Sequence, residues 1–234
     1  MISMNNLKNL SFLIYGLGIT GKSVINFFKK NNFKNYQVWD DRKLIYKKKR
    51  PQNFDKSLEE VDYIILSPGV SLNESKNKEK LTKHKNKIIT DIDLFFLCNK
   101  NFKSIVVTGT NGKSTTCKII SHVLKKHKIK ALLGGNIGTP LLSLKTKKNT
   151  FVIIEVSSFQ LAYSKFIRPD YALLLNITND HIDWHGSMKN YIDSKFKIFK
   201  NQKKNQFALL NNNLKYQLKK RKLLGKIIIP KIEN

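Results

Sequence analysis

Short apolar runs alternate with glycine-rich turns and with segments of helical periodicity along most of this chain. The runs are continuous, as in residues 12–15, which read Phe-Leu-Ile-Tyr. Such runs are typical of strands buried on both faces, and the helical segments between them favour crossover connections. The pattern therefore predicts an α/β fold with parallel sheets. It places strands at residues 12–15, 36–39, 63–66, 104–107, 151–154, 171–175 and 226–230, and helices at residues 23–30, 91–97 and in a segment that ends at Leu124.

The order of strand, glycine turn and helix occurs twice, which predicts two domains. The lysine-rich residues 76–87 indicate a solvated helix or loop, and residues 91–97 indicate an amphipathic helix that leads out of the first domain. We place the boundary in the polar stretch that follows. The prediction is a Rossmann-like domain at residues 1–98 and a P-loop-type parallel-sheet domain at residues 99–234.

The chain is strongly basic, with a net charge of +28 at pH 7. A basic nucleic-acid-binding P-loop protein is one explanation. The excess is mostly Lys, spread along the sequence beside abundant Asn and Ile, and the basic runs at 47–50 and 219–222 lack interleaved aromatic residues. We therefore favour the codon usage of an AT-rich genome as its source and expect no nucleic-acid partner.

Two cysteines and short apolar runs limit the class of protein. Cys98 and Cys117 cannot form a disulfide framework, and no run reaches the ~18 residues of a membrane span. We expect a soluble, cytoplasmic protein with no membrane partner.

The first glycine turn has the spacing of a nucleotide-binding fingerprint. Gly16, Gly18 and Gly21 follow the strand at 12–15, and Asp40 lies 19 residues after Gly21, close to the ~20 of a dinucleotide site. The third strand ends in Ser67-Pro68-Gly69. A nicotinamide-dependent oxidoreductase is one reading of this pattern, and glycines that serve only a tight turn are another.

The second glycine turn reads as a phosphate-binding loop. Backbone N–H groups of such a loop cradle phosphate oxygens, Lys113 adds a positive charge, and the hydroxyl of Ser114 or Thr115 reaches Mg²⁺. Val107 stands where the general pattern has glycine. The loop predicts a site for a nucleoside triphosphate. Its ATP-binding residues are Gly109, Thr110, Asn111, Gly112, Lys113, Ser114 and Thr115.

Polar residues end the next two buried strands. Glu155 follows residues 151–154, and a carboxylate at that place is suited to hold Mg²⁺. Residues 176–181 end the strand at 171–175 in the same way. We expect His185 to be structural or on the surface. His84, His122 and His127 lie in lysine-rich stretches and are expected to be solvated.

Together these motifs resemble the Mur ligase family of ATP-dependent amide ligases, which build the peptidoglycan stem peptide. Residues 108–114 are similar to the family's ATP loop, which accounts for Val107. Folylpolyglutamate synthases have a similar loop, but the other motifs separate the two families. Within the Mur ligases, the motifs are most similar to members that join D-glutamate to UDP-N-acetylmuramoyl-L-alanine. They lie at residues 16–21, 67–70, 135–138 and 155–161.

The resemblance implies roles for individual residues. Glu155 and His181 match magnesium-binding residues. Lys195 matches a lysine that CO₂ carbamylates, which would make it a ligand of a second Mg²⁺. Ser114 is the fourth implied metal ligand. From composition alone Lys195 would be one more solvated lysine. The implied catalytic residues are Lys113, Asn136, His181 and Lys195. The implied substrate-binding residues are Gly18, Ile19, Thr20, Asp40, Asp41, Arg42, Ser67, Gly69 and Asn136.

The resemblance also implies a reaction. An acyl phosphate forms from ATP and the L-alanine carboxylate of the UDP-sugar, and the D-glutamate amine then attacks it; ATP and two Mg²⁺ are the implied cofactors. Family members have three domains. We expect the third to be absent here, the second to be incomplete at its C-terminus, and the chain to be a monomeric fragment that binds the UDP-substrate without completing catalysis.

Overall fold

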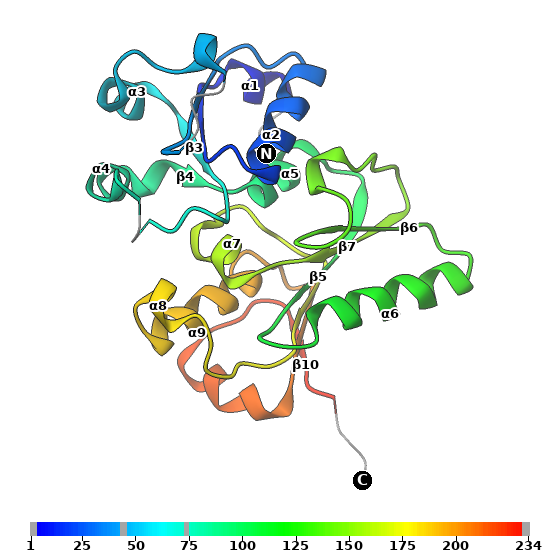
Figure 1. Ribbon diagram of the computed structural model, residues 1–234. Coiled ribbons are helices and arrows are strands. Elements are labelled where there is room, and N and C mark those ends of the chain that lie inside the picture. The colour runs from blue at the N-terminus through cyan, green and yellow to red at the C-terminus, as the bar shows by residue number, and fades with distance from the viewer. Residues whose placement is uncertain (1–3, 43–45, 73–74, 231–234) are drawn as a thin grey trace. The chain divides into compact units, whose positions relative to one another are not determined.

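The apolar runs form the strands of two parallel sheets in a computed structural model that describes residues 4–42, 46–72 and 75–230. Figure 1 traces the chain from end to end. The chain divides into an N-terminal unit, Met1–Cys98 with Tyr163–Lys165, and a C-terminal unit, Asn99–Ala162 with Phe166–Asn234. The predicted α/β class with parallel sheets is confirmed.

The N-terminal unit is built on a four-stranded parallel sheet in the order β2-β1-β3-β4. Because β2 and β3 lie on opposite sides of β1, the sheet has a topological switch point beside β1. The strands are β1 Phe12–Tyr15, β2 Tyr36–Trp39, β3 Tyr63–Leu66 and β4 Ile88–Ile89. The helices are α1 Met4–Asn9, α2 Ile19–Lys30, α3 Phe54–Glu60, α4 Lys78–Lys83 and α5 Asp91–Cys98, with 3-10 turns at Lys47–Lys49 and Lys85–Lys87.

Aromatic side chains fill the space between α2 and the sheet. Phe28 of α2 is fully buried, stacks on Phe33 at 4.5 Å between ring centroids and meets Phe12 of β1 edge-on at 5.0 Å. Burying a side chain of this size stabilises a fold by about 1.5–3 kcal/mol. This packing fixes α2 against β1, and the turn between them carries the first glycine motif.

A short segment from later in the chain completes the N-terminal unit. The buried carboxylate of Asp93 accepts hydrogen bonds through Oδ1 from Ser164 Oγ at 2.7 Å and from the backbone N–H of Lys165 at 2.9 Å. The ring of Tyr163 packs against the core of the unit. Residues Tyr163–Lys165 therefore belong with the N-terminal unit although they lie far from it in sequence.

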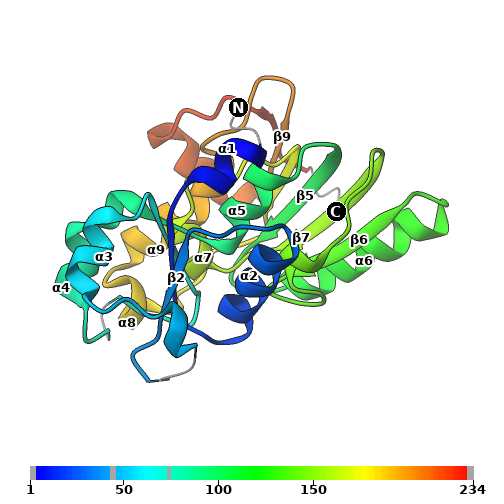
Figure 2. The same cartoon turned by 90° about the horizontal axis from the view of Figure 1, so that it is seen from above.

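The C-terminal unit has a six-stranded parallel sheet in the order β10-β9-β8-β5-β7-β6. Figure 1 shows α6 lying along this sheet, and Figure 2 shows α8 beside α9. The strands are β5 Phe102–Thr108, β6 Ala131–Gly135, β7 Thr150–Glu155, β8 Tyr171–Leu174, β9 Phe207–Leu210 and β10 Lys226–Ile228. The helices are α6 Lys113–Lys126, α7 Ser158–Tyr163, α8 Ile182–His185 and α9 Met188–Phe196, with 3-10 segments at Leu141–Ser143, Lys197–Phe199 and Asn212–Lys220.

Three strands lay outside the prediction. β4 has two residues behind a lysine-rich segment, β6 ends in glycines that read as a turn, and β9 is a short run between lysines and asparagines. Each pairs with an apolar strand that the sequence does predict, namely β3, β7 and β8 in turn, so stability comes from pairing within the sheet and not from a strong strand signal in its own sequence. No helix among the described residues is long and apolar enough to cross a membrane.

Candidate functional site

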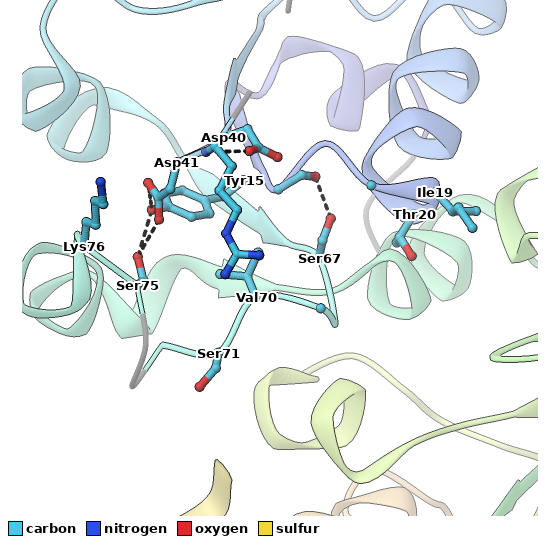
Figure 3. A pocket seen from close by; sticks show the side chains of 14 residues that line it. Tyr15, Ile19, Thr20, Asp40, Asp41, Ser67, Val70, Ser71, Ser75 and Lys76 are labelled. Carbon is cyan, nitrogen blue, oxygen red and sulfur yellow. Dashed lines mark hydrogen bonds between the residues drawn. The ribbon is translucent and has the colours of Figure 1, made fainter. Parts of the chain in front are cut away.

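A pocket of about 410 Å³ lies at the carboxyl ends of β1, β2 and β3 in the N-terminal unit (Figure 3). Such a position, beside the switch point of an open α/β sheet, is where these sheets bind ligands. All eight substrate-contact residues predicted in this unit line it: Gly18, Ile19, Thr20, Asp40, Asp41, Arg42, Ser67 and Gly69. Six further residues line it that the sequence analysis did not select: Tyr15, Gly16, Val70, Ser71, Ser75 and Lys76.

The three glycines of the first turn have different structural roles. Gly16 has φ +90°, and a Cβ there would lie 2.7 Å from Val70 Cγ2. A Cβ on Gly21 would lie 2.0 Å from the carbonyl oxygen of Gly16, which also accepts a hydrogen bond from Ser67 Oγ at 2.7 Å. A Cβ on Gly18 would meet nothing within 4 Å. Gly16 and Gly21 therefore allow close packing, whereas Gly18 keeps the pocket open.

Asp40 ties the glycine turn to the end of β2. Its carboxylate accepts hydrogen bonds from the backbone N–H of Leu17 at 2.6 Å and from that of Arg42 at 2.9 Å. A dinucleotide site uses the acidic residue at this place for a ribose hydroxyl and has a second three-stranded half. The described N-terminal unit has one three-stranded half, β1 to β3, and only the short β4 beside it. This sheet favours the binding of a single nucleotide over that of a dinucleotide.

Asp41 lies among four donors. Its oxygens accept hydrogen bonds from Tyr15 Oη at 2.6 Å, Trp39 Nε1 at 3.0 Å, Ser75 Oγ at 3.0 Å and Asn77 Nδ2 at 2.9 Å. Partial burial by itself raises the pKa of this carboxyl group, but the four hydrogen bonds outweigh burial and lower the pKa. Asp41 is thus a fixed anion that joins β1, β2 and the segment before α4.

The phosphate-type loop of the C-terminal unit joins β5 to α6. Gly112 precedes the helix with φ +81°, a conformation that glycine adopts without strain. Lys113 Nζ donates to the carbonyl oxygen of Gly109 at 3.0 Å and to that of Thr110 at 2.7 Å. The first turn of α6 directs backbone N–H groups and the positive end of the helix dipole toward the loop, which suits an anion.

Glu155, at the end of β7, gathers two of the predicted residues. Its side chain is 2% exposed and accepts hydrogen bonds from Ser114 Oγ at 2.6 Å and Asn136 Nδ2 at 3.0 Å. Asn136 reaches it because Gly135, with φ +106°, brings the end of β6 against β7, where a Cβ would lie 2.4 Å from the Glu155 carbonyl oxygen. The phosphate loop, β6 and β7 thus meet at one carboxylate.

Lys195 is buried, so the expectation from composition that it is solvated is wrong. It lies on α9 with 2% exposure, donates from Nζ to the carbonyl oxygen of Gly109 at 2.7 Å and lies 4.7 Å from the ring centre of Tyr191. Burial, and then the charge of Lys113, lower the pKa of this ammonium group to about 7. A lysine-rich neighbourhood in sequence does not reveal which lysine α9 turns inward.

His181 and His185 differ in exposure. The His181 side chain is 48% exposed and pairs with the adjacent Asp180 at 3.2 Å, whereas His185 is buried with Nε2 3.0 Å from Ser158 Oγ. Burial, and then the charges of Lys195 and His181, lower the pKa of His185 to about 4. Burial of His185 excludes a position on the surface, whereas its structural role stays a prediction. His122 and His127 are exposed, as expected, whereas His84 is half-buried.

Some of the side chains around Glu155 suit Mg²⁺ and others do not. In the part of the chain that the structure describes, no group of three His, Cys, Asp or Glu residues could hold a metal ion. One carboxylate and one hydroxyl, Glu155 and Ser114, do suit Mg²⁺, which keeps several waters and shares phosphate oxygens of the substrate. Lys195 does not suit a metal in its ammonium form. It could bind a second ion together with His181 only after carbamylation of Lys195.

Two further residues position the loop, of which the sequence analysis named Asn176 only as part of a polar strand end and did not select Tyr191. Asn176, at the end of β8, binds the backbone of the phosphate loop, and Tyr191 of α9 hydrogen-bonds to Thr110 Oγ1 at 2.9 Å. The strand-end position of Asn176 was a usable signal. Tyr191 gave none, because its contact joins residues 81 positions apart.

We expect acid to destabilise the protein through His185. Between its ordinary pKa of 6.5 and its folded pKa of about 4, the unfolded chain takes up a proton that the folded chain refuses, so stability falls as pH falls. The expected loss is about 3 kcal/mol by pH 4. Urea unfolding of the parent and of His185→Gln at pH 7 and pH 4.5 measures it. The same pH dependence in both proteins would contradict the role of His185.

Two family models match this chain. Residues 107–232 match the Mur ligase middle domain, and residues 10–89 match the Mur ligase MurD-like N-terminal domain. Among solved structures, a UDP-N-acetylmuramate:L-alanyl-gamma-D-glutamyl-meso-diaminopimelate ligase from Neisseria meningitidis aligns with a TM-score of 0.56 at 16% identity, covering 94% of this chain and 77% of that one. At this identity the likeness supports the fold alone.

Curated relatives carry a common name. The UDP-N-acetylmuramoylalanine--D-glutamate ligase of Wolbachia pipientis wMel is 41% identical over 208 residues, which cover 84% of this chain and 40% of the relative. The protein of the same name from Aquifex aeolicus is 35% identical over 212 residues, which cover 90% of this chain and 49% of the relative. The chain thus spans about half the length of the curated relatives it matches. The resemblance stated from the motifs is confirmed: this chain belongs to the Mur ligase family.

Proposed function

We propose that this chain carries the UDP-substrate and ATP-phosphate sites of a ligase that joins D-glutamate to UDP-N-acetylmuramoyl-L-alanine. The observation that carries the proposal is the cluster around Glu155, where the hydroxyl of the phosphate loop and the amide of Asn136 meet one buried carboxylate. The curated relatives named for this reaction support the choice of substrates.

The proposed chemistry is phosphoryl transfer followed by acyl transfer. The L-alanine carboxylate attacks the γ-phosphorus of ATP, the bond to the β–γ bridging oxygen breaks, and ADP leaves with that electron pair. The D-glutamate amine then attacks the acyl phosphate, loses a proton and expels phosphate. Lys113 neutralises charge on the transferring oxygens, so these residues act mainly by positioning and electrostatic stabilisation.

Glu155 and the Ser114 hydroxyl would hold Mg²⁺ together with water and phosphate oxygens. The ion supplies positive charge against the triphosphate when it is bound. Asn136 and Ser114 donate to different oxygens of the Glu155 carboxylate, so together they fix its orientation. In this proposal Asn136 also contacts the substrate, and His181 is a catalytic residue and a metal ligand.

Carbamylation of Lys195 is the second part of the metal proposal. A neutral amine attacks CO₂ and releases a proton, so the cation becomes an anion able to bind a second Mg²⁺ with His181. Burial of Lys195 favours the neutral amine. No carboxylate among the described residues forms an ion pair with Lys195, so the reaction breaks no such pair.

Residues 1–98 bind the UDP-substrate in this proposal, and residues 99–234 bind ATP. The pocket beside β1 binds the uridine diphosphate of the substrate, with Arg42 as its cationic contact, and the loop between β5 and α6 binds ATP. The protein would act in the cytoplasm as a monomer, in the synthesis of peptidoglycan precursors.

We expect UDP-N-acetylmuramoyl-L-alanine to raise the melting temperature of the purified chain. A ligand at 100 times its Kd stabilises by about 2.7 kcal/mol, enough for a clear shift. Arg42→Ala, which changes one exposed pocket residue, should reduce the shift, and Lys30→Ala at the end of α2 is the matched control. A shift with NADH but not with the UDP-sugar would refute the proposal and favour an oxidoreductase.

A further inference from the structure

The amide of Asn176 forms three hydrogen bonds with the backbone of the phosphate loop. Its Oδ1 accepts from the N–H of Thr110 at 3.0 Å and from the N–H of Asn111 at 2.9 Å, and its Nδ2 donates to the carbonyl oxygen of Asn111 at 3.0 Å. The carbonyl oxygen of Asn176 also accepts from the N–H of Thr110 at 3.0 Å. The loop is therefore held from the end of β8, 65 residues further along the chain.

Thr110 is held from a second direction as well. Its Oγ1 accepts a hydrogen bond from the N–H of Thr178 at 3.0 Å and lies 2.9 Å from Tyr191 Oη. Tyr191 is fully buried on α9, which also carries Lys195. The strand end and the helix thus converge on the same loop residue.

These contacts divide the loop into two parts. The N–H groups of Thr110 and Asn111 already donate to Asn176, so they are not free to donate to a phosphate oxygen. The N–H of Thr116 donates to the Gly112 carbonyl oxygen. The donors that helix geometry leaves for an anion are those of residues 112–115, at the beginning of α6.

We infer that Asn176 is a positioning residue of the ATP site, an inference that rests on the proposed function. It anchors residues 110–111, and the anchored loop presents residues 112–115 and the Lys113 side chain to the triphosphate. Because the Asn176 amide both accepts and donates, it holds the Asn111 carbonyl oxygen as well as the two N–H groups. An ordered loop has less conformational entropy to lose when ATP binds.

The test compares Asn176→Ala with Asn179→Ala, its matched control. Asn179 is exposed on the same strand end and forms no hydrogen bond of this kind. Titration calorimetry with Mg-ATP should show a 10- to 100-fold weaker affinity in Asn176→Ala and an unchanged affinity in Asn179→Ala. Affinity for UDP, which the N-terminal unit binds, should stay within twofold in both variants and reports that they are folded.

Asn176→Asp provides a second variant of nearly the same shape. The carboxylate still accepts the two N–H bonds, but it cannot donate to the Asn111 carbonyl oxygen and adds a negative charge near the phosphates. We expect Mg-ATP to bind at least as weakly as in Asn176→Ala, again with UDP affinity retained. A purely structural role would instead lower the melting temperature and both affinities together.

Hydrogen exchange tests the anchor without nucleotide. The amide of Asn111 should exchange at least tenfold more slowly in the parent than in Asn176→Ala, whereas the amide of Thr110 keeps its bond to the carbonyl oxygen of residue 176 in both. Mg-ATP affinity in Asn176→Ala equal to that of the parent, or rapid exchange of both amides in the parent, would overturn the inference and leave the proposed function standing. A parent that binds UDP but not Mg-ATP would overturn the ATP half of the proposed function and this inference with it.

Discussion

Replacing Lys113 by methionine is expected to weaken Mg-ATP binding by about 10- to 100-fold, since a hydrogen bond to a charged group contributes about 1.5–3 kcal/mol. Lys113 Nζ reaches two loop carbonyl oxygens, at 3.0 and 2.7 Å, so it lies inside the loop where the phosphates would bind. Methionine keeps most of the aliphatic chain and removes only the charge and the donors. The loss should therefore appear in Mg-ATP affinity more than in folding.

Titration calorimetry with Mg-ATP measures this prediction, with the melting temperature measured in parallel. Lys118→Met is the matched control, because Lys118 lies on the exposed face of the same helix. An affinity for Mg-ATP in Lys113→Met within threefold of that of the parent would show that Lys113 does not meet the triphosphate.

The sequence revealed the strands that carry their own signal. β1, β2 and β3 match the predicted limits, because each is a short apolar run bounded by polar or glycine residues. Helix α2 begins at Ile19 rather than Ser23, inside the glycine motif. Gly18 stands before it without a side-chain cap, so the usual signal of a helix start is missing.

Long-range contacts in the candidate sites could not be read from local pattern. Asn176, Tyr191 and Lys195 reach the phosphate loop from 65 to 86 residues away. The strand end marked Asn176 and the family resemblance marked Lys195, but neither signal showed that the side chain would contact the loop. Asp41 was selected as a substrate contact, yet its oxygens are occupied by four side-chain donors of the same unit. Residue type and spacing located the pocket, whereas the division of labour within it depends on tertiary packing.

The second large effect is expected at Gly21, where alanine should destabilise the N-terminal unit by about 3 kcal/mol or more. In a helix alone the change would be favourable by about 1 kcal/mol. The added Cβ, however, would lie 2.0 Å from the Gly16 carbonyl oxygen and 3.0 Å from its carbonyl carbon. These are backbone atoms, so α2 must move away from the turn, and the bond from Ser67 Oγ to the Gly16 carbonyl oxygen is then strained.

Gly18→Ala separates this packing role from ligand binding. Gly18 has φ −72°, and its added Cβ would meet nothing within 4 Å, so urea unfolding should give a free energy within about 0.5 kcal/mol of the parent. Gly18 is one of the residues that line the pocket, so affinity for UDP should fall when a methyl group is added there. If Gly21→Ala unfolds at the same urea concentration as Gly18→Ala, α2 is not packed on the turn as described, and a pocket built from that turn loses its physical basis.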